Sequence, residues 1–267
     1  MKDSSFMLNE AGSRGGAIFA YADSRVDLRR SKFLNNRAES GGALSITTNY
    51  NAAAVNYKQV LDECVLSGNN ATLGGAIEAM GEPAIVVRSS QLSRNSADDS
   101  GGGMYFYDGA VLEMEGSAML HNTARVNGGS CLIEASAASL LNVFVLDSTA
   151  GENGGGIHFA GKASTGTVIG STFGRCNATK VGWKSTVFDQ PYHHHQHHHH
   201  STDPSTTTAI PLKNGGCIAV DNDVDSLTID STDFNGCLSH EQGGAVHASG
   251  ETSLVVSDSS FTNCEVP

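Results

Sequence analysis

Cysteine is the residue type with the most direct capacity for covalent chemistry in this 267-residue chain, which contains six. Cys176, Cys237 and Cys264 hold the same position in successive copies of a sequence repeat, three residues after a phenylalanine. If the copies stack as neighbouring strands, like positions lie about 4.8 Å apart, within the Cα separation that a disulfide accepts. This spacing allows one disulfide among these three, which would favour an oxidising compartment. The alternative is free cysteines buried as small apolar residues; no CxxC pair indicates a zinc or thioredoxin-like site.

A histidine-rich segment offers a second kind of chemistry. The stretch YHHHQHHHHSTDPSTTT begins at Tyr192 and lies in a low-complexity insertion at 183–212. Such runs can bind Ni²⁺ or Zn²⁺, and the histidines concerned are His193, His194, His195, His197, His198, His199 and His200. The preferred interpretation is a compositionally biased loop on a rigid scaffold, so we predict no metal site and no cofactor.

Two N-glycosylation sequons occur, one at Asn70 and one at Asn177. Two sequons in a chain of this length are close to the number expected by chance. They become informative only if the protein is secreted by a eukaryotic cell.

Composition and charge exclude some partners. The 28 acidic residues outnumber the 16 Lys and Arg residues, and the formal net charge is −12. Because nucleic-acid affinity depends on Lys and Arg contacts with phosphates, the chain is not expected to bind nucleic acid. No window approaches 18 uncharged apolar residues, so no membrane insertion is expected. The first 30 residues lack the apolar core of a signal peptide, which suggests either an intracellular protein or a piece of a longer secreted chain.

The chain is organised by a repeat that begins with a pair of glycines. Five of the seven intervals between successive pairs measure 26 to 28 residues, and such a fixed period indicates a solenoid. The two longer intervals, 33 and 61 residues, contain insertions around TTNYNAAAVNYKQ and at 183–212. The pairs are Gly15-Gly16, Gly41-Gly42, Gly74-Gly75, Gly101-Gly102, Gly128-Gly129, Gly154-Gly155, Gly215-Gly216 and Gly243-Gly244.

Aligned copies show the alternation of strands. After each glycine pair, two apolar columns flank a column of no common character, which is typical of a strand with one buried face. The second half of each copy carries a large apolar column, in which Phe6 and Phe33 stand, followed three residues later by Asn9, Asn36, Asn69, Asn95 and Asn122. We predict an all-β, right-handed parallel β-helix of about eight to nine coils without a helical domain. It comprises residues 1–182 and continues at 213–267.

The repeated columns have structural roles under this interpretation. Paired glycines fit a corner where the backbone needs a positive φ or has no room for a Cβ atom. Asparagine fits a turn because it tolerates left-handed conformations, and stacked amides can hydrogen bond from coil to coil. We therefore assign the glycine, phenylalanine and asparagine columns to structure and predict no catalytic residue among them.

The combination of GGAI segments (Gly15–Ile18 and Gly74–Ile77) with FxxN segments (Phe6–Asn9 and Phe33–Asn36) resembles the repeats of chlamydial polymorphic outer membrane proteins. Similar repeats also occur in algal and protist proteins. The resemblance covers almost the whole chain except the insertion, and it implies a β-helical, adhesive surface protein. The sequence departs from the pattern in its last three coils, where cysteine replaces asparagine, and it contains no C-terminal membrane barrel.

An enzyme is the alternative, because pectate lyases and polygalacturonases place reactive residues on one face of this fold. A catalytic or Ca²⁺ site needs outward carboxylates on adjacent coils. The outward column after the glycine pairs offers only Glu78, beside Ser45 and Tyr105, while His158 and His247 are separated by a coil. The other acidic clusters are expected in turns of single coils: Asp98-Asp99, and Asp221 with Asp223 and Asp225.

These observations favour an extracellular structural or adhesive segment of a larger surface or filament protein, located outside the cell or on its surface. Its expected partners are a surface receptor or a glycan. Both ends of the sequence stop in mid-coil without a polar cap, and solenoids need caps. We therefore also expect further β-helix coils or like subunits to stack end to end on it.

Overall fold

The computed structural model describes residues 1–22, 24–48, 58–179 and 215–267. Within these ranges every regular element is a β-strand and no helix is present; accordingly, the described chain offers no helix that could cross a membrane. The expected insertions around TTNYNAAAVNYKQ and at 183–212, including the seven histidines named above, lie wholly or mostly outside the described residues.

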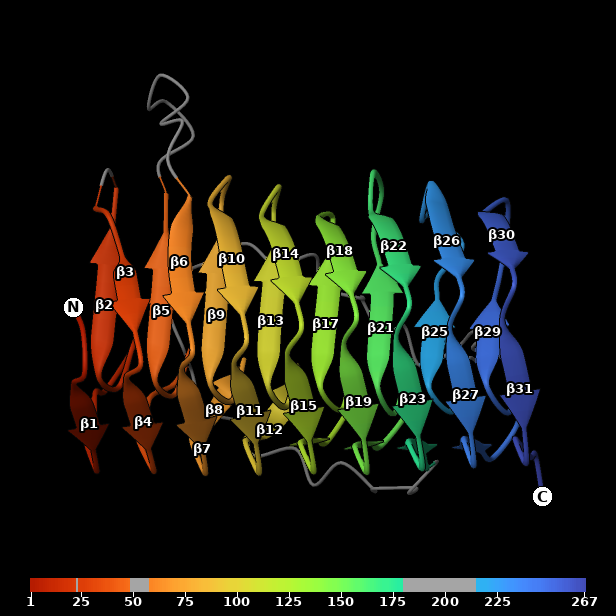
Figure 1. Cartoon of the computed structure of the whole chain (residues 1–267), viewed down its shortest axis with the longest axis horizontal. Coiled ribbons are helices and arrows are strands. Elements are labelled where there is room, and N and C mark those ends of the chain that lie inside the picture. Colours follow the sequence, from red (N-terminus) through yellow and green to blue (C-terminus); the bar gives the residue numbers. More distant parts are fainter. Residues whose placement is uncertain (23, 49–57, 180–214) are drawn as a thin grey trace, which may run out of the picture.

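The chain winds through four parallel sheets for about eight turns, so that equivalent strands lie side by side along the long axis (Figure 1). The Gly-Gly sheet, which follows the glycine pairs, contains β2 (Ile18–Tyr21), β5 (Leu44–Thr47), β9 (Ile77–Met80), β13 (Met104–Tyr107), β17 (Cys131–Glu134), β21 (Ile157–Ala160), β25 (Ile218–Val220) and β29 (Val246–Ala248). The middle sheet contains β3 (Asp27–Arg29), β6 (Gln59–Asp62), β10 (Ala84–Arg88), β14 (Val111–Glu115), β18 (Ala137–Leu141), β22 (Thr165–Ile169), β26 (Ser226–Asp230) and β30 (Ser253–Ser257).

The remaining two sheets complete each coil. The Phe sheet contains β1 (Ser5–Met7), β4 (Lys32–Leu34), β7 (Val65–Ser67), β11 (Gln91–Ser93), β15 (Ala118–Leu120), β19 (Phe144–Leu146), β23 (Thr172–Gly174), β27 (Asp233–Asn235) and β31 (Ser260–Thr262). The short sheet contains β8 (Asn70–Leu73), β12 (Ser96–Ser100), β16 (Thr123–Ala124), β20 (Thr149–Ala150), β24 (Asn177–Ala178) and β28 (Leu238–Ser239). This architecture confirms the predicted parallel β-helix.

The register of the strands keeps like residues together. Phe6 is paired with Phe33, and Phe234 with Phe261, as the alignment of the repeats predicts. The rings of these two pairs stack with centroids 4.7 and 4.8 Å apart. The inward columns form one continuous core in which Phe33 and Phe234 are fully buried. The coils on either side of 180–214 pair directly through β21 and β25, so they share this core.

The glycine pairs form the corner before the Gly-Gly sheet. Gly101 has a φ of +69°, in the left-handed region that favours glycine. Gly102 has a different constraint: a Cβ atom there would lie 2.2 Å from the carbonyl oxygen of Gly129 and 2.3 Å from that of Thr123. The first glycine of a pair therefore supplies the turn, and the second allows neighbouring coils to approach.

The asparagine column makes the predicted ladder, but it does not itself take the left-handed conformation. The residue before it does so in every coil; Asn35 and Arg94, for example, both have a φ of 53°. This turn directs the next side chain into the interior, where Asn95 Nδ2 donates to Asn122 Oδ1 at 3.1 Å and to the Leu66 carbonyl at 3.0 Å. The backbone N–H and Nδ2 of Asn69 both donate to Asn95 Oδ1. The expectation that asparagine supplies the left-handed residue is therefore wrong, because its amide is needed for hydrogen bonds between coils.

Candidate functional site

The outward column of the Gly-Gly sheet brings polar side chains together on one face. Ser45 of β5, Glu78 of β9, Tyr105 of β13 and His158 of β21 project away from the core, because they alternate with the inward residues. They are nevertheless buried, with 0, 1, 6 and 3 % of their surface exposed. A buried polar group must find hydrogen-bond partners, so the partners of these residues define the chemistry of the face.

Glu78 is held by two hydroxyl donors from neighbouring coils. Ser45 Oγ donates to Glu78 Oε2 at 2.5 Å, and Tyr107 Oη donates to Glu78 Oε1 at 3.1 Å. Ser45 and Glu78 are register partners, whereas Tyr107 reaches Glu78 diagonally. The carboxylate is thus an acceptor in a network that spans three coils.

Two tyrosines on β13 connect this carboxylate to a second one. The rings of Tyr105 and Tyr107 stack with centroids 4.8 Å apart, and Tyr105 Oη donates to Glu134 of β17. Burial, together with the neighbouring carboxylates, raises the pKa of both phenols far above the usual value. Both tyrosines therefore remain protonated hydrogen-bond donors over the physiological pH range.

Further along the column, His158 meets an acidic residue of the next coil. His158 Nε2 lies 3.0 Å from Asp221 Oδ1, and Asp221 follows β25 directly. The other ring nitrogen, Nδ1, is buried without a hydrogen-bond partner. A histidine and a carboxylate in this arrangement can exchange a proton or fix one tautomer.

The two halves of this polar face do not form one reactive centre. From Glu78 to His158 the column passes through Tyr105 and Leu132, so the two residues are three strand spacings, roughly 14 Å, apart. Nowhere in the described ranges do three or more His, Cys, Asp or Glu side chains gather in a group that could hold a metal ion. The face therefore offers a network around Glu78 and Glu134 at one end and a separate pair of His158 and Asp221 at the other.

The predicted disulfide column is wrong in its pairing. Cys237 is bonded to Cys217 of the same coil, with their Cα atoms 5.5 Å apart, whereas Cys176 and Cys264 are free. The reason is the direction of the side chains: this column faces the residue after the glycine pair across the narrow interior. Cys176 has no such partner, because Gly156 stands opposite it. Its Sγ atom instead lies 3.4 Å from the Val145 carbonyl oxygen.

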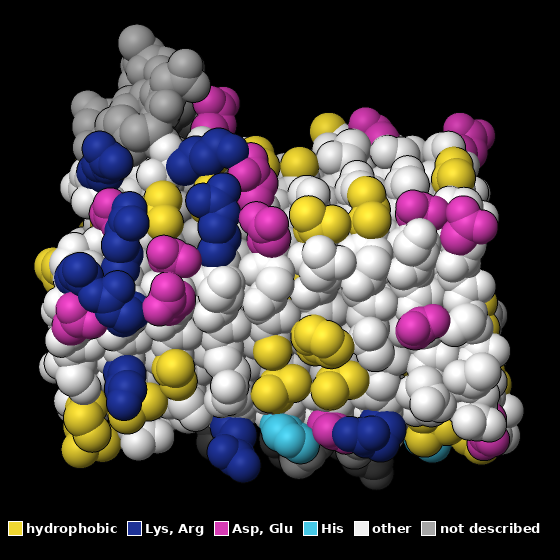
Figure 2. Space-filling model, in the orientation of Figure 1, with side chains coloured by type: hydrophobic (Ala, Val, Ile, Leu, Met, Phe, Trp, Pro, Cys, Tyr) yellow, Lys and Arg dark blue, Asp and Glu magenta, His cyan; other side chains and the backbone are white. Residues whose placement is uncertain are grey.

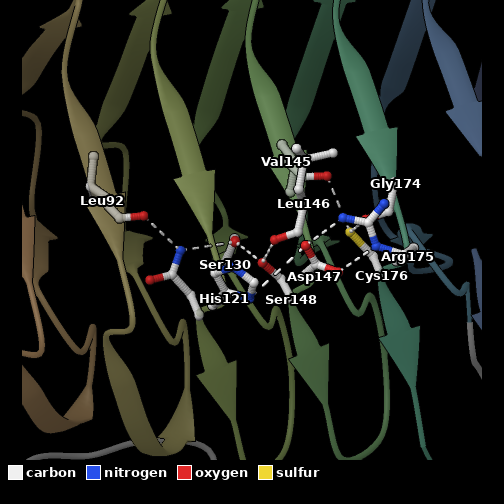
Figure 3. A network of polar contacts seen from close by, with 11 residues as sticks. Leu92, His121, Ser130, Val145, Leu146, Asp147, Ser148, Gly174, Arg175 and Cys176 are labelled. Carbon is white, nitrogen blue, oxygen red and sulfur yellow. Dashed lines mark hydrogen bonds and ion pairs between the residues drawn. The ribbon is translucent and has the colours of Figure 1, made fainter.

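The same pairing across the interior occurs two coils earlier without a covalent bond (Figure 3). Ser130 Oγ and Ser148 Oγ are 2.7 Å apart, and Asn122 Nδ2 donates to Ser130 Oγ at 3.3 Å. Ser130 and Ser148 are equivalent in the repeat to Cys217 and Cys237. The asparagine ladder thus ends at a pair of hydrogen-bonded serines. Two coils later, the disulfide joins the equivalent two positions.

An ion pair lies on the outside of this corner. Arg175 Nε and Nη2 bind both oxygens of Asp147 at 2.6 and 2.7 Å. The hydrogen bonds from Arg175 lower the pKa of Asp147 below its usual value. His121 lies beside the pair, with Nδ1 4.0 Å from Asp147 Oδ2.

Asp98 and Asp99 lie within strand β12, so their expected position in a turn is wrong. The sequon residues Asn70 and Asn177 are the first residues of β8 and β24 and are half-buried. Asn177 Oδ1 is a buried oxygen atom without a hydrogen-bond partner.

Sequence reasoning missed several members of the polar face. Tyr107 and Glu134 are the last residues of β13 and β17. Each stands two residues after the outward column of its strand and therefore faces the same side. Arg14 contributes from another part of the coil, and its Nη1 donates to Thr47 Oγ1 at 2.9 Å. Because strand residues alternate between the two faces, the sequence could have indicated Tyr107 and Glu134. The contact of Asp221 with His158 could not be found in this way, since it joins different positions of two coils.

Comparison with known proteins gives no match to a protein-family model, to a curated protein or to a solved structure. The chain is therefore described by its own architecture, a parallel β-solenoid of about eight turns.

Proposed function

We propose that this chain is an extracellular structural or adhesive β-helix segment of a larger surface or filament protein, with repeats of the polymorphic outer membrane protein type. The observation that carries the proposal is the unbroken register of the inward columns from β1 to β31. Such a scaffold holds its outward side chains at a fixed spacing, which suits a surface that binds an extended partner. The disulfide between Cys217 and Cys237 supports an oxidising location.

The Phe sheet presents a surface suited to adhesion. Hydrophobic side chains gather over β15 and β19 (Figure 2), and we call Ala118, Leu120, Phe144 and Leu146 the apolar patch. Phe144 is 51 % exposed, and the other three are half-buried. His121 follows β15, Asp147 follows β19 and Arg175 follows the neighbouring strand β23, and together they give the patch a charged margin. Exposed apolar area with a polar margin is typical of binding sites for proteins and glycans.

A binding experiment tests this function. The protein is applied to arrays of glycans and extracellular-matrix proteins, and the bound ligand is titrated against wild type and Phe144→Ser. We expect saturable binding that Phe144→Ser weakens about tenfold, since the loss of an exposed aromatic anchor costs on the order of 1–2 kcal/mol. Ile169→Ser is the matched control, because Ile169 is 37 % exposed on the middle sheet, outside the patch. Equal effects of the two variants would remove the patch from the proposal.

A carbohydrate-active enzyme, such as a polysaccharide lyase or glycoside hydrolase, is the second candidate. It is favoured by the two carboxylates, Glu78 and Glu134, each of which accepts a hydrogen bond from a tyrosine on one face. Incubation with acidic polysaccharides, with and without Ca²⁺, tests it by the appearance of reducing or unsaturated ends. Activity that is abolished in Glu78→Gln would establish the enzyme and refute the purely structural role.

A further inference from the structure

A row of ionisable residues occupies the corner between the Phe sheet and the short sheet. This is the left-handed position that precedes the asparagine column. We call its occupants in four successive coils the charged row: Arg94, His121, Asp147 and Arg175, with φ angles of 49 to 55°. The coils on either side have Gly68 and Gly236 at the same position. A residue with a Cβ atom is strained in this conformation and glycine is not, so these four side chains are placed here at a cost to the backbone.

The charged row adjoins the apolar patch. Strand β15 ends at Leu120 and leads directly into His121, and β19 ends at Leu146 and leads into Asp147. Figure 2 shows the histidine, in cyan, with an acidic side chain and Lys or Arg side chains along the lower edge of the hydrophobic patch. The apolar and the charged side chains therefore form one continuous surface on the same coils.

Neutral polar residues border the patch along the axis of the solenoid. The register places Gln91 of β11, Ala118, Phe144 and Thr172 of β23 in one outward row. Neighbours in this row are about 4.8 Å apart. Gln91 is exposed and Thr172 is half-buried. The exposed ring of Phe144 thus lies between an amide and a hydroxyl, both of which can donate and accept hydrogen bonds.

The binding capacity that remains in the charged row is cationic. Arg175 already satisfies both oxygens of Asp147 at 2.6 and 2.7 Å. Arg94 is exposed, and its side chain has no ion-pair or hydrogen-bond partner in the part of the chain that the structure describes. Its guanidinium group offers donors in a planar arrangement that matches a carboxylate. A chain with a net charge of −12 therefore presents an unpaired cation beside its apolar patch.

We propose that the apolar patch and the charged row together bind a glycan that carries carboxylate groups, as uronic and sialic acids do. This inference rests on the proposed function, because it names the ligand class of the adhesive surface. The apolar face of a sugar ring would pack on Phe144, and its hydroxyls would bind Gln91 and Thr172. The carboxylate would accept charge-assisted hydrogen bonds from Arg94.

The size of the surface favours an oligosaccharide. The patch, the charged row, Gln91 and Thr172 amount to ten residues, whereas a stable protein interface uses roughly 20–30 residues on each side. From Arg94 to Arg175 the charged row extends over three strand spacings, roughly 14 Å, which exceeds a single sugar ring. A neutral glycan would leave Arg94 unused, and the net charge disfavours a nucleic acid.

Matched pairs of probes test the role of the carboxylate. Titration calorimetry compares a hyaluronan oligosaccharide with its carboxyl-reduced form, and sialyllactose with lactose. We expect the carboxylated member of at least one pair to bind about tenfold more tightly than its neutral counterpart. Added NaCl should weaken that binding, since the contact is exposed to solvent. The pair that shows the difference distinguishes a uronic acid ligand from a sialic acid ligand.

Three variants, each checked for folding by circular dichroism, test the residues. Arg94→Gln should weaken binding of the carboxylated probe about tenfold and leave the neutral probe unchanged. Arg125→Gln is the matched control, because Arg125 is an equally charged, exposed residue that follows β16, outside the surface. It should bind like the wild type. Asp147→Asn should bind the carboxylated probe more tightly, since it removes a like charge and releases Arg175.

Some outcomes would overturn the proposal. Equal affinity for the carboxylated and neutral probes would do so, and so would equal losses in Arg94→Gln and Arg125→Gln. Binding that depends on Phe144 but is confined to neutral glycans or matrix proteins would refute this ligand class and leave the adhesive function standing. Absence of binding to every glycan and matrix protein would refute both.

Discussion

The free cysteines show how one residue type acquires different reactivity from its place in a coil. Cys131 and Cys176 are buried, and burial raises the pKa of both thiols, that of Cys176 to about 12. Cys64 is also buried with a raised pKa. Cys264 is half-buried at the end of the molecule. Because the thiolate is the reactive form, position rather than residue type should decide which cysteine reacts.

Thiol titration gives the corresponding prediction. Native protein at pH 8 should react rapidly with a disulfide reagent at about one thiol, that of Cys264, and Cys264→Ser should abolish this fast phase. Unfolding without a reductant should release the four thiols that are free, and reduction should release all six. Since the folded pKa of Cys176 is raised, its labelling should stay slow until the pH approaches 12. Six thiols without reduction would contradict the disulfide.

At the scale of the elements, the asparagine ladder is the clearest link between a repeated residue and stability. Asn95 is fully buried and makes hydrogen bonds to both neighbouring coils, to Asn69 and Leu66 of the preceding coil and to Asn122 of the following one. At this corner some backbone N–H and C=O groups have no partner in a strand, and the Asn95 side chain forms the hydrogen bonds that water would otherwise provide. A buried polar group that loses its partner costs about 1–3 kcal/mol.

We predict that Asn95→Ala lowers the free energy of unfolding by about 3 kcal/mol, measured by urea denaturation followed by circular dichroism. Asn9→Ala is the matched control at the exposed end of the same column, where water can replace the amide. It should cost less than about 1 kcal/mol. Equal losses in the two variants would show that the ladder does not derive its strength from burial.

The strands and their register could be predicted from the sequence because the same positions recur in every repeat. Only one alignment of the repeats places all the alternating apolar residues on the inner face. Two contacts could not be predicted. The bond of Cys217 to Cys237 depends on which positions face each other across the interior, and a repeat alignment compares only residues that stack. The burial of Glu78 and Tyr105 was also missed, since alternation shows that they point outward but does not show whether they reach solvent.

At the scale of the whole molecule, a solenoid divides its stability among neighbouring coils. Each coil contacts mainly the coils before and after it, so a local change should spread only a short distance. The disulfide closes a loop of 20 residues in a single coil near the C-terminal end. A cross-link of this size contributes about 3 kcal/mol by restricting the unfolded chain.

We therefore predict that the double variant Cys217→Ala and Cys237→Ala destabilises the C-terminal coils selectively. Hydrogen exchange followed by mass spectrometry should accelerate strongly in peptides from 215–267 and stay unchanged from 58 to 120. The double variant Ser130→Ala and Ser148→Ala removes the equivalent pair two coils earlier, where only a hydrogen bond is lost. It should accelerate exchange more weakly and around residues 120–160, consistent with a loss of about 1 kcal/mol. Uniform acceleration along the chain in the cysteine variant would instead mean that the solenoid unfolds as one cooperative unit.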